Sequence, residues 1–123
     1  MTKVVRIYEN GGPEVLRIED VDLGPPGPGE VLVRQSAIGL NFRDIYIRNG
    51  VHKSDRFPRG LGSEGAGVIE ALGEGVDAFS LGQRVVVSSM PDVAYAEARM
   101  APAHRVVALP DNIDERTAAA GMI

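Results

Sequence analysis

Residues 29–50 read GEVLVRQSAIGLNFRDIYIRNG, and this stretch decides the fold that the sequence predicts. Its first part, EVLVRQSAIGL (30–40), is rich in apolar and β-branched residues and predicts the longest strand of the chain. Its second part, FRDIYIR (42–48), has apolar residues at helical spacing and is followed by the stop signal Asn49-Gly50. A long strand is therefore expected to lead directly into a short helix.

Short apolar runs between turns continue on both sides of this stretch. The 15 glycines and 8 prolines indicate many turns, and the absence of Trp leaves the core to Val, Ile, Leu and Ala. Further strands are predicted over residues 3–8, 14–22, 65–72, 84–87, 93–100 and 104–109. Roughly six or seven short strands in one small domain predict a mainly β fold, either a partly open barrel or a sandwich.

Two of these strands carry more specific expectations. In EVLRIEDVD (14–22), Leu16 and Ile18 alternate with polar residues and should point to one side, which predicts a half-buried strand. In GAGVIEAL (65–72), the glycines predict a β-bulge or the close approach of another backbone segment.

The chain ends in a second helix signal. Asp114 is the predicted N-cap, and Glu115 suits the positive end of the helix dipole. The predicted helix runs to Ile123 through apolar residues, without a cap or a polar tail. A natural C-terminus rarely ends in this way, so we expect the chain to be the front part of a longer protein.

Composition narrows the classes of function. A net charge of -4 and scattered Lys and Arg residues argue against a nucleic-acid partner. The absence of cysteine excludes a disulfide scaffold and a cysteine-based zinc site, and it agrees with a cytoplasmic location. The N-terminus does not read as a signal peptide, and no apolar run reaches the roughly 18 residues that a membrane helix needs.

One motif is misleading. GLGSEG (60–65) matches the dinucleotide fingerprint G-x-G-x-x-G letter for letter. The fingerprint holds a pyrophosphate only where it joins a strand to a helix N-terminus. Here RFPR (56–59) makes a poor central strand, and the residues after the motif read as a strand and a turn. We therefore interpret these glycines as positions of tight backbone packing.

Four segments together resemble a known family. They are GGPEVL (11–16), GEVLVRQSAIGLNFRDIYIRNG (29–50), FPRGLGSEGAGVIEALGEGV (57–76) and GQRVVV (82–87). In this order and spacing they are similar to the N-terminal, GroES-like catalytic domain of medium-chain dehydrogenases/reductases. The branch they most resemble is that of the zinc-free, zeta-crystallin-like quinone oxidoreductases. The resemblance covers almost the whole chain.

The resemblance implies a domain plan and a cofactor. Residues 1–113 would form a GroES-like partly open β-barrel with short helices, and residues 114–123 would begin the helix that leads to a Rossmann domain holding NADPH. In the family, a segment that returns after the Rossmann domain completes the catalytic domain. Without that segment an apolar face would be exposed, and the chain could form a homodimer through it.

The resemblance also bears on metal binding. Zinc alcohol dehydrogenases have a Cys ligand where this chain has Asn41, and a His ligand where it has Ser63. A catalytic zinc needs about three protein ligands of N, S or O type, and His52 and His104 are each isolated in the sequence. The sequence therefore predicts no metal site, and a hydride transfer that depends on positioning and fixed polar groups.

The segment after the long strand has two interpretations. By residue type alone, Asn41 is the N-cap of the short helix, and Asp44 completes a capping-box-like pair. The resemblance places this segment against the nicotinamide and its ribose, and the two roles are compatible. The cofactor-binding residues that it implies are Asn41, Phe42, Arg43, Asp44, Ile45 and Tyr46.

Tyr46 and His52 are the candidate catalytic residues. The resemblance brings the Tyr46 hydroxyl near the nicotinamide, whereas residue type alone favours a packed aromatic. Many quinone oxidoreductases have a tyrosine where this chain has His52. A histidine there could donate a proton to a reduced quinone oxygen, or to the α-carbon in an enoyl reductase. An exposed loop histidine is the alternative.

Four other residues near the predicted site have simpler interpretations. Arg48 is expected to be a solvated residue at the helix end. Glu64 is expected to be a buried acid that needs a partner, most simply an arginine from outside the chain. Met90 and Tyr95 could line the pocket or belong to the core.

Three functions follow from these observations. The first is the substrate-domain portion of an NADPH-dependent quinone oxidoreductase, whose small-molecule partner is a quinone or a related activated alkene. The second is an enone or enoyl-thioester reductase on the same fold, which His52 leaves open. The third is a stand-alone GroES-like binding module without catalysis. In the first case the fragment alone is expected to be inactive.

Overall fold

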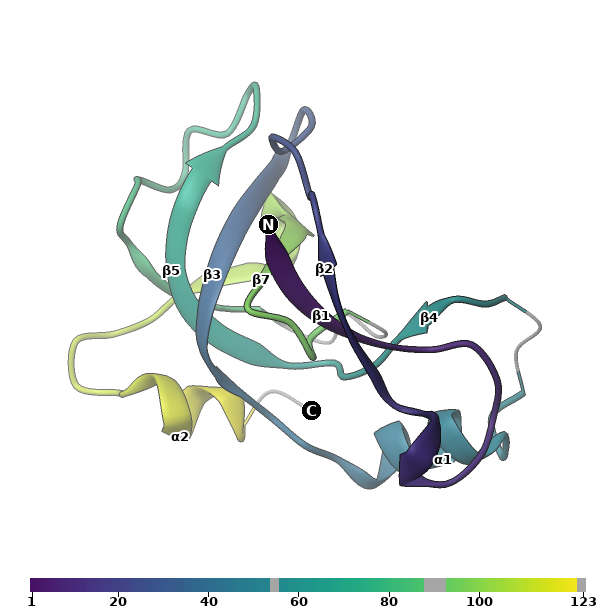
Figure 1. Ribbon diagram of the computed structural model, residues 1–123. Helices are drawn as coiled ribbons and strands as arrows, with labels where there is room; N and C mark the ends of the chain where they lie inside the picture. Colours follow the sequence, from purple (N-terminus) through teal and green to yellow (C-terminus); the bar gives the residue numbers. More distant parts are fainter. Residues whose placement is uncertain (54–55, 88–92, 122–123) are drawn as a thin grey trace.

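The computed structural model describes residues 1–53, 56–87 and 93–121 (Figure 1). Its strands are β1 (Thr2–Ile7), β2 (Arg17–Val21), β3 (Glu30–Ile38), β4 (Arg59–Gly60), β5 (Gly65–Leu72), β6 (Arg84–Val87), β7 (Ala98–Pro102) and β8 (Val106–Ala108). The helices are α1 (Phe42–Asn49) and α2 (Glu115–Ala119), with 3-10 turns η1 (Pro13–Val15) and η2 (Ala103–Arg105). The architecture is mainly β, as the sequence predicts.

The strands form two antiparallel sheets. The larger sheet has the order β7-β3-β5-β6-β8, and the smaller has the order β2-β1-β4. The two longest strands, β3 and β5, pair at the centre of the larger sheet, with Val31 opposite Leu72 and Ile38 opposite Gly65. Within the described residues the two sheets do not join into a closed ring, so the predicted partly open barrel is confirmed.

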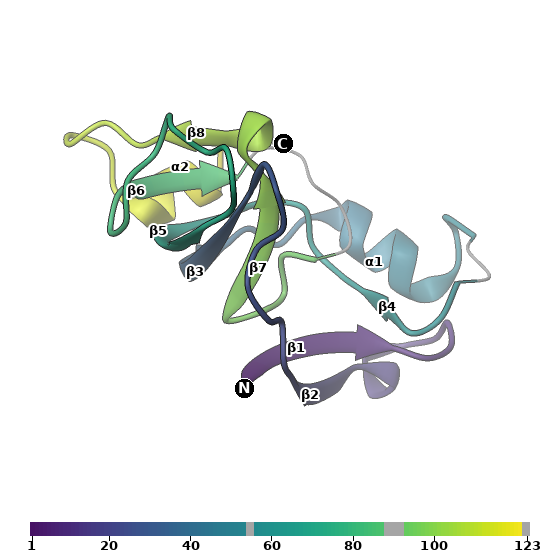
Figure 2. The same cartoon turned by 90° about the horizontal axis from the view of Figure 1, so that it is seen from above.

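Each helix is fixed to a different sheet. Figure 2 shows α1 on the side of the smaller sheet and α2 against the larger one. The cluster that holds α1 consists of the buried residues Ile7, Val15, Ile47 and Leu61. The cluster that holds α2 is built from small side chains, and Ala118 and Ala119 of the helix pack on Ala66 and Val86 of the sheet. Because β3 runs from the larger sheet directly into α1, the start of α1 lies where the two parts meet.

The centre of the larger sheet confirms the expectations for β3 and β5. The β3–β5 register shifts between Leu32 and Val33 and again between Gln35 and Ala37, which are the irregularities predicted by the glycines of residues 65–72. A Cβ atom on Gly67 would overlap the carbonyl group of the neighbouring β3 strand. The close backbone approach predicted for this segment is therefore confirmed.

The prediction for residues 14–22 was partly wrong. Pro13 opens η1, so the strand begins only at Arg17. Proline fixes φ near the helical value and lacks an N–H, which favours the first position of a helical turn. Ile18 is 73% exposed, so this side of β2 is not buried as the alternation predicted.

Two further strand predictions also need correction. In the segment 93–100 the strand begins only at Ala98 and continues to Pro102. In the segment 104–109 the strand begins at Val106, because η2 occupies Ala103–Arg105. The sequence indicated a poor central strand at residues 56–59, and in the structure Arg59 and Gly60 form only the two-residue edge strand β4 beside β1. Such short pairings depend on a distant partner and leave no periodicity in the sequence.

Within the residues that the structure describes, neither helix has the length and apolar character needed to cross a membrane.

Candidate functional site

The candidate site begins at the first turn of α1. Asn41 is the N-cap, with an extended backbone (φ -127°, ψ 155°). Its backbone N–H donates to Asp44 Oδ2 at 3.1 Å, and the Asp44 N–H donates to the Asn41 carbonyl at 3.0 Å. The helix ends before Gly50, which has a φ of 90° and closes it in the left-handed conformation. The predicted cap, the partner acid and the stop signal are all confirmed.

The Asp44 side chain lies on the buried side of α1 and not on its solvent-exposed side. It is 2% exposed, and its Oδ2 atom also accepts a hydrogen bond from the Tyr95 hydroxyl at 2.8 Å. Its Oδ1 atom is buried and has no hydrogen-bond partner among the described residues. Burial, followed by the hydrogen bond to Asp44, raises the pKa of Tyr95 well above its ordinary value, so the hydroxyl is held as a neutral donor. Asp44 therefore ties the first turn of α1 to the segment that carries Tyr95.

The opposite face of α1 is open to solvent. Phe42 is 75% exposed and Tyr46 is 42% exposed, and Ile45 is partly exposed. The sequence placed these three residues on one face, and the structure turns that face outward because Ile47 and Asp44 occupy the buried side. An exposed aromatic surface on a fixed helix can contact a planar ring.

The two candidate catalytic residues lie side by side. The rings of Tyr46 and His52 meet edge to face, with centroids 5.8 Å apart and an interplanar angle of 83°. The His52 backbone N–H donates to the Tyr46 carbonyl at 3.0 Å, which holds the loop after α1 against the helix. His52 is exposed, so its imidazole is accessible to a ligand at this end of the helix.

A polar cluster connects α1 to the segment before β5. Asn41 Nδ2 donates to Glu64 Oε1 at 3.2 Å, and Arg43 Nη1 donates to Ser63 Oγ at 3.3 Å. Ser63 and Glu64 are 2% and 1% exposed. Glu64 is buried, as the sequence predicted, and the Asn41 amide is one of its partners. An arginine from outside the chain stays a prediction. The positions that hold zinc ligands in the metal-dependent relatives, 41 and 63, both belong to this cluster.

A cavity of about 360 Å³ adjoins this cluster. Its lining includes Asn41 and Glu64, the end of β3 and, from α2, Arg116. Gly39 lies at a crowded point, because a Cβ atom there would overlap the Glu64 side chain and lie 2.5 Å from the Ala119 carbonyl oxygen. The absence of a side chain at residue 39 therefore lets Glu64 reach the Asn41 amide.

The remaining sequence predictions near the site can now be placed. Tyr95 packs against the cluster that holds α1, and Met90 lies outside the described residues. Arg48 donates from Nε to the Gly11 carbonyl at 3.2 Å, so it joins α1 to a neighbouring loop and is not simply solvated. In the described part of the chain, no three His, Cys, Asp or Glu residues gather as metal ligands would.

The glycine motif GLGSEG does not form a phosphate loop. Gly60 ends β4 and Gly65 begins β5, so no helix N-terminus follows the motif. Gly62 has a φ of 90°, and a Cβ atom on it would lie 2.5 Å from Tyr95 Cδ1. The interpretation as tight packing is therefore confirmed, and the packed group is the ring that reaches Asp44. Sequence reasoning missed the hydrogen bond between Tyr95 and Asp44, because the two residues are 51 positions apart in the chain.

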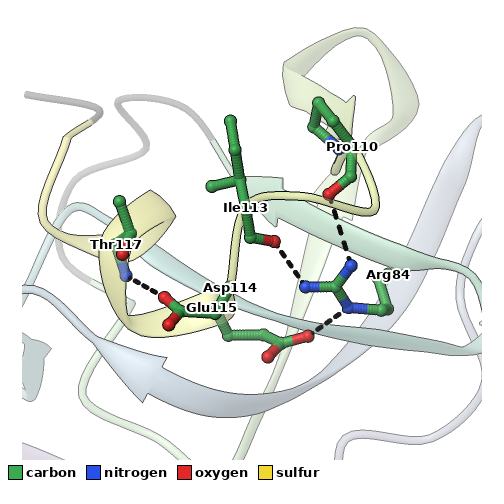
Figure 3. Close-up of polar contacts among 6 residues, drawn as sticks. All are labelled: Arg84, Pro110, Ile113, Asp114, Glu115 and Thr117. Atoms are coloured by element: carbon green, nitrogen blue, oxygen red, sulfur yellow. Dashed lines mark hydrogen bonds and ion pairs between the residues drawn. The ribbon is translucent and has the colours of Figure 1, made fainter.

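Arg84 holds the segment that leads from the larger sheet into α2 (Figure 3). Arg84 of β6 contacts Glu115 Oε1 from Nε at 2.5 Å and donates from Nη2 to the Ile113 carbonyl at 2.6 Å. Asp114 accepts from the Thr117 N–H at 2.8 Å, which confirms the predicted N-cap. The helix is shorter than predicted: it ends at Ala119, and residues 122–123 lie outside the description.

Comparison with known proteins agrees with this geometry. The model of the alcohol dehydrogenase GroES-like domain matches residues 27–111. A quinone oxidoreductase of Pseudomonas aeruginosa is 46% identical over 123 residues, which are 100% of this chain and 38% of the relative. A 2-haloacrylate reductase of a Burkholderia species is 38% identical over 117 residues, covering 93% of this chain and 35% of the relative.

A solved structure shows the same similarity to quinone oxidoreductases. The crystal structure of the Escherichia coli quinone oxidoreductase complexed with NADPH superimposes with a TM-score of 0.92 at 36% identity, over 98% of this chain and 37% of that one. The chain thus spans about 38% of the length of curated quinone oxidoreductases that it matches. The family model covers most of the chain, and its residues include both β3 and α1. The chain therefore belongs to the alcohol dehydrogenase GroES-like domain family.

Proposed function

We propose that this chain is the substrate-domain portion of an NADPH-dependent quinone oxidoreductase that transfers a hydride to a quinone without zinc. In this proposal, residues 1–113 form the substrate domain, and residues 114–123 lead into a second domain that holds most of the NADPH. The observation that carries the proposal is the arrangement of side chains at the start of α1. Phe42 and Tyr46 are exposed there, and the buried Asp44 carboxylate holds the turn in place by accepting the Asn41 N–H. The similarity to quinone oxidoreductases over the whole chain supports the choice of substrate.

The residues at this turn fit a nicotinamide. The ring is flat and carries a carboxamide, so it needs an apolar wall and polar partners at one edge. Phe42, Ile45 and Tyr46 supply the wall. The Asn41 amide nitrogen is engaged by Glu64, and its Oδ1 atom, which faces the Asp44 N–H in the capping box, has a second lone pair for a carboxamide N–H. Arg43, bonded to Ser63 at the same edge, places a positive charge where a ribose or phosphate oxygen would lie.

The reaction needs one hydride and one proton. NADPH, when bound, would supply the hydride, which carries two electrons and would add to one quinone oxygen, leaving NADP⁺. The other quinone oxygen must gain a proton to give the hydroquinone. His52 and Tyr46 are the groups that we assign to this step, since both are accessible and lie in edge-to-face contact. Their proximity lets the imidazole deliver the proton while the tyrosine hydroxyl orients the substrate.

Positioning must then replace the Lewis acid of the metal-dependent relatives. Asn and Ser occupy positions 41 and 63, and neither side chain is a usual zinc ligand. The cluster instead provides fixed dipoles, because Glu64 and Ser63 are buried and each is bonded to a residue of the α1 turn. Prearranged polar groups stabilise developing charge without having to reorganise during the reaction.

The experiment uses a joined enzyme, defined as residues 1–123 of this chain followed by the remaining part of the Pseudomonas aeruginosa quinone oxidoreductase. We expect it to oxidise NADPH with 1,4-benzoquinone at a rate within about tenfold of the Pseudomonas parent. The 123-residue chain alone should show no turnover. His52→Phe in the joined enzyme should lower kcat about tenfold to a hundredfold, while the matched variant His104→Phe, in η2, should not.

The outcome that contradicts the proposal is a folded joined enzyme that binds NADPH but shows no turnover with any quinone. Turnover by the 123-residue chain at the parent's rate would contradict the requirement for a second domain. A folded joined enzyme that neither binds NADPH nor turns over would favour a binding module without catalysis.

A second candidate function is the reduction of an activated alkene, such as an enone or an enoyl thioester. It is favoured by the 2-haloacrylate reductase among the similar proteins and by His52, which could protonate the α-carbon. The same joined enzyme separates the two functions. A higher kcat/KM for a crotonyl thioester or an enone than for benzoquinone would select the alkene.

A further inference from the structure

We propose that Tyr95 is a positioning residue for the candidate site, acting through Asp44 on the Asn41 backbone. Its catalytic consequence rests on the proposed function, but its structural consequence does not. Tyr95 belongs neither to α1 nor to the polar cluster, yet its hydroxyl contacts the carboxylate that caps the helix. The contact joins the segment before β7 to the first turn of α1.

The first step of the argument is that the Tyr95 backbone is rigidly held. Its N–H donates to the Leu61 carbonyl and its carbonyl accepts from the Val5 N–H, both at 2.8 Å. Gln35 Nε2 donates at 2.9 Å to the carbonyls of the residues on either side of Tyr95. Hydrogen bonds from three separate segments therefore fix the point from which the ring extends.

The second step is that Gly62 restricts the position of the Tyr95 ring. Gly62 packs against it so closely that any Cβ atom at residue 62 would lie 2.5 Å from the ring. The positive φ of Gly62 keeps that backbone in a conformation that other residues rarely adopt. The ring is therefore confined on one side by the motif GLGSEG and points its hydroxyl at Asp44.

The third step is that Asp44 depends on this hydroxyl. Two donors, the Tyr95 hydroxyl and the Asn41 N–H, meet the same oxygen, Oδ2, at 2.8 and 3.1 Å. The other oxygen is buried without a partner among the described residues. A buried carboxylate that loses one of two donors becomes free to reorient, since a charge-assisted bond is among the stronger contacts of a side chain. The N-cap would then lose its fixed acceptor, and the Asn41 amide that faces the cavity would lose its position.

The test compares Tyr95→Phe with Tyr8→Phe in the 123-residue chain by native-state hydrogen exchange. Tyr8 is a matched control, because its hydroxyl also donates to a carboxylate, that of Glu19 at 2.7 Å, but on the exposed β1–β2 hairpin. We expect the Asn41 amide to exchange at least about tenfold faster in Tyr95→Phe than in Tyr8→Phe. Amides at the centre of β3, such as Val33, should change equally little in both.

A role in global stability alone would give a different pattern, with Val33 and Asn41 accelerated by the same factor. That pattern, or an Asn41 amide that is unchanged, overturns the inference. Should Tyr95→Phe not fold, it is made together with Asp44→Asn, so that no buried charge loses its donor. The Asn41 amide must then exchange faster in the double variant than in Asp44→Asn alone; equal rates would overturn the inference.

The joined enzyme supplies the functional readout. Tyr95→Phe should lower kcat for benzoquinone about tenfold with less than about a twofold change in the KM for NADPH, because most of the cofactor is held elsewhere. Tyr8→Phe should leave both unchanged. A rise in the KM for NADPH with unchanged kcat contradicts a positioning role. A wild-type joined enzyme without turnover contradicts the proposed function, and the exchange experiment then decides the role of Tyr95 independently.

Discussion

At the scale of single residues, the site depends on places where a side chain is absent. Gly39 leaves room for the Glu64 carboxylate, and Gly62 leaves room for the Tyr95 ring. Buried Glu64 and partly buried Tyr95 then reach α1: Glu64 bonds the Asn41 amide, and Tyr95 bonds the acid that caps the helix. Glycine therefore contributes to the chemistry of this site by permitting contacts between segments that are distant in the chain.

Substitution of Gly62 tests this view. Gly62 and Gly82 have similar positive φ values, 90° and 80°, but only at Gly62 would a Cβ atom meet a neighbour. We expect Gly82→Ala to lower the free energy of unfolding by about 1–2 kcal/mol, the usual strain of a left-handed residue. Gly62→Ala should lower it by at least about 1 kcal/mol more, because the added methyl group overlaps the Tyr95 ring. Urea unfolding measures both, and equal losses would contradict the packing role.

Residue-scale prediction from the sequence succeeded where the partners are close in the chain. The cap at Asn41 and its partner Asp44 are three residues apart, a spacing that local helix geometry fixes. The hydroxyl that completes the arrangement comes from Tyr95, and no spacing rule connects residues 44 and 95. The burial of Asp44 was missed for the same reason, since a first-turn acid is usually solvated and only the distant partner makes burial favourable.

At the scale of elements, α2 is held by charge as well as by packing. The hydrogen bond from Arg84 is the main cause that lowers the pKa of Glu115 below its ordinary value of 4.5. Because the folded-state pKa is lower than the unfolded one, this contact stabilises the fold above pH 4.5 and is lost as the pH falls through the folded value. The junction between β6 and α2 should therefore weaken in acid.

Glu115→Gln tests the acid dependence. It should lower the urea midpoint at pH 7, and the midpoint should then fall less than that of the wild type between about pH 6 and pH 3. Asp20→Asn is the control, because the Lys3–Asp20 pair is more than half exposed on both sides and should contribute little. A Glu115→Gln chain that retains the full acid dependence of the wild type would show that other carboxylates dominate.

Elements with strong local patterns were predicted well from the sequence. The long apolar run at residues 30–40 became β3, and the Gly-rich run at 65–72 became β5 with its irregular register. β4 was missed because it is only two residues long and exists by pairing with β1. The strand predicted from residue 93 begins at Ala98, because the N–H groups of residues 93–95 bond to the loop at Leu61 and Gly62, and Ala96 makes only an isolated bridge to Val4 of β1.

At the scale of the whole molecule, the candidate site lies at the junction between two separately packed parts. One apolar cluster holds α1 on the smaller sheet, another holds α2 on the larger sheet, and β3 runs between them. The mainly β class followed from composition and strand count, and the choice of a partly open barrel over a sandwich followed from the family resemblance. The placement of the site followed from the family resemblance, since no local pattern distinguishes a helix start that binds a cofactor from one that is only capped.

The central claim is that residues 41–46 contact the nicotinamide, and the methyl spectrum of the joined enzyme tests it most directly. The enzyme is labelled at the isoleucine δ1 methyl groups, and NADP⁺ is added to saturation. Ile45 and Ile47 lie in the same helix, but Ile45 is partly exposed on the candidate face and Ile47 is 0% exposed. The account predicts that the Ile45 signal shifts with NADP⁺ while the Ile47 signal stays in place. Binding of NADP⁺ that leaves the Ile45 signal unmoved would contradict it.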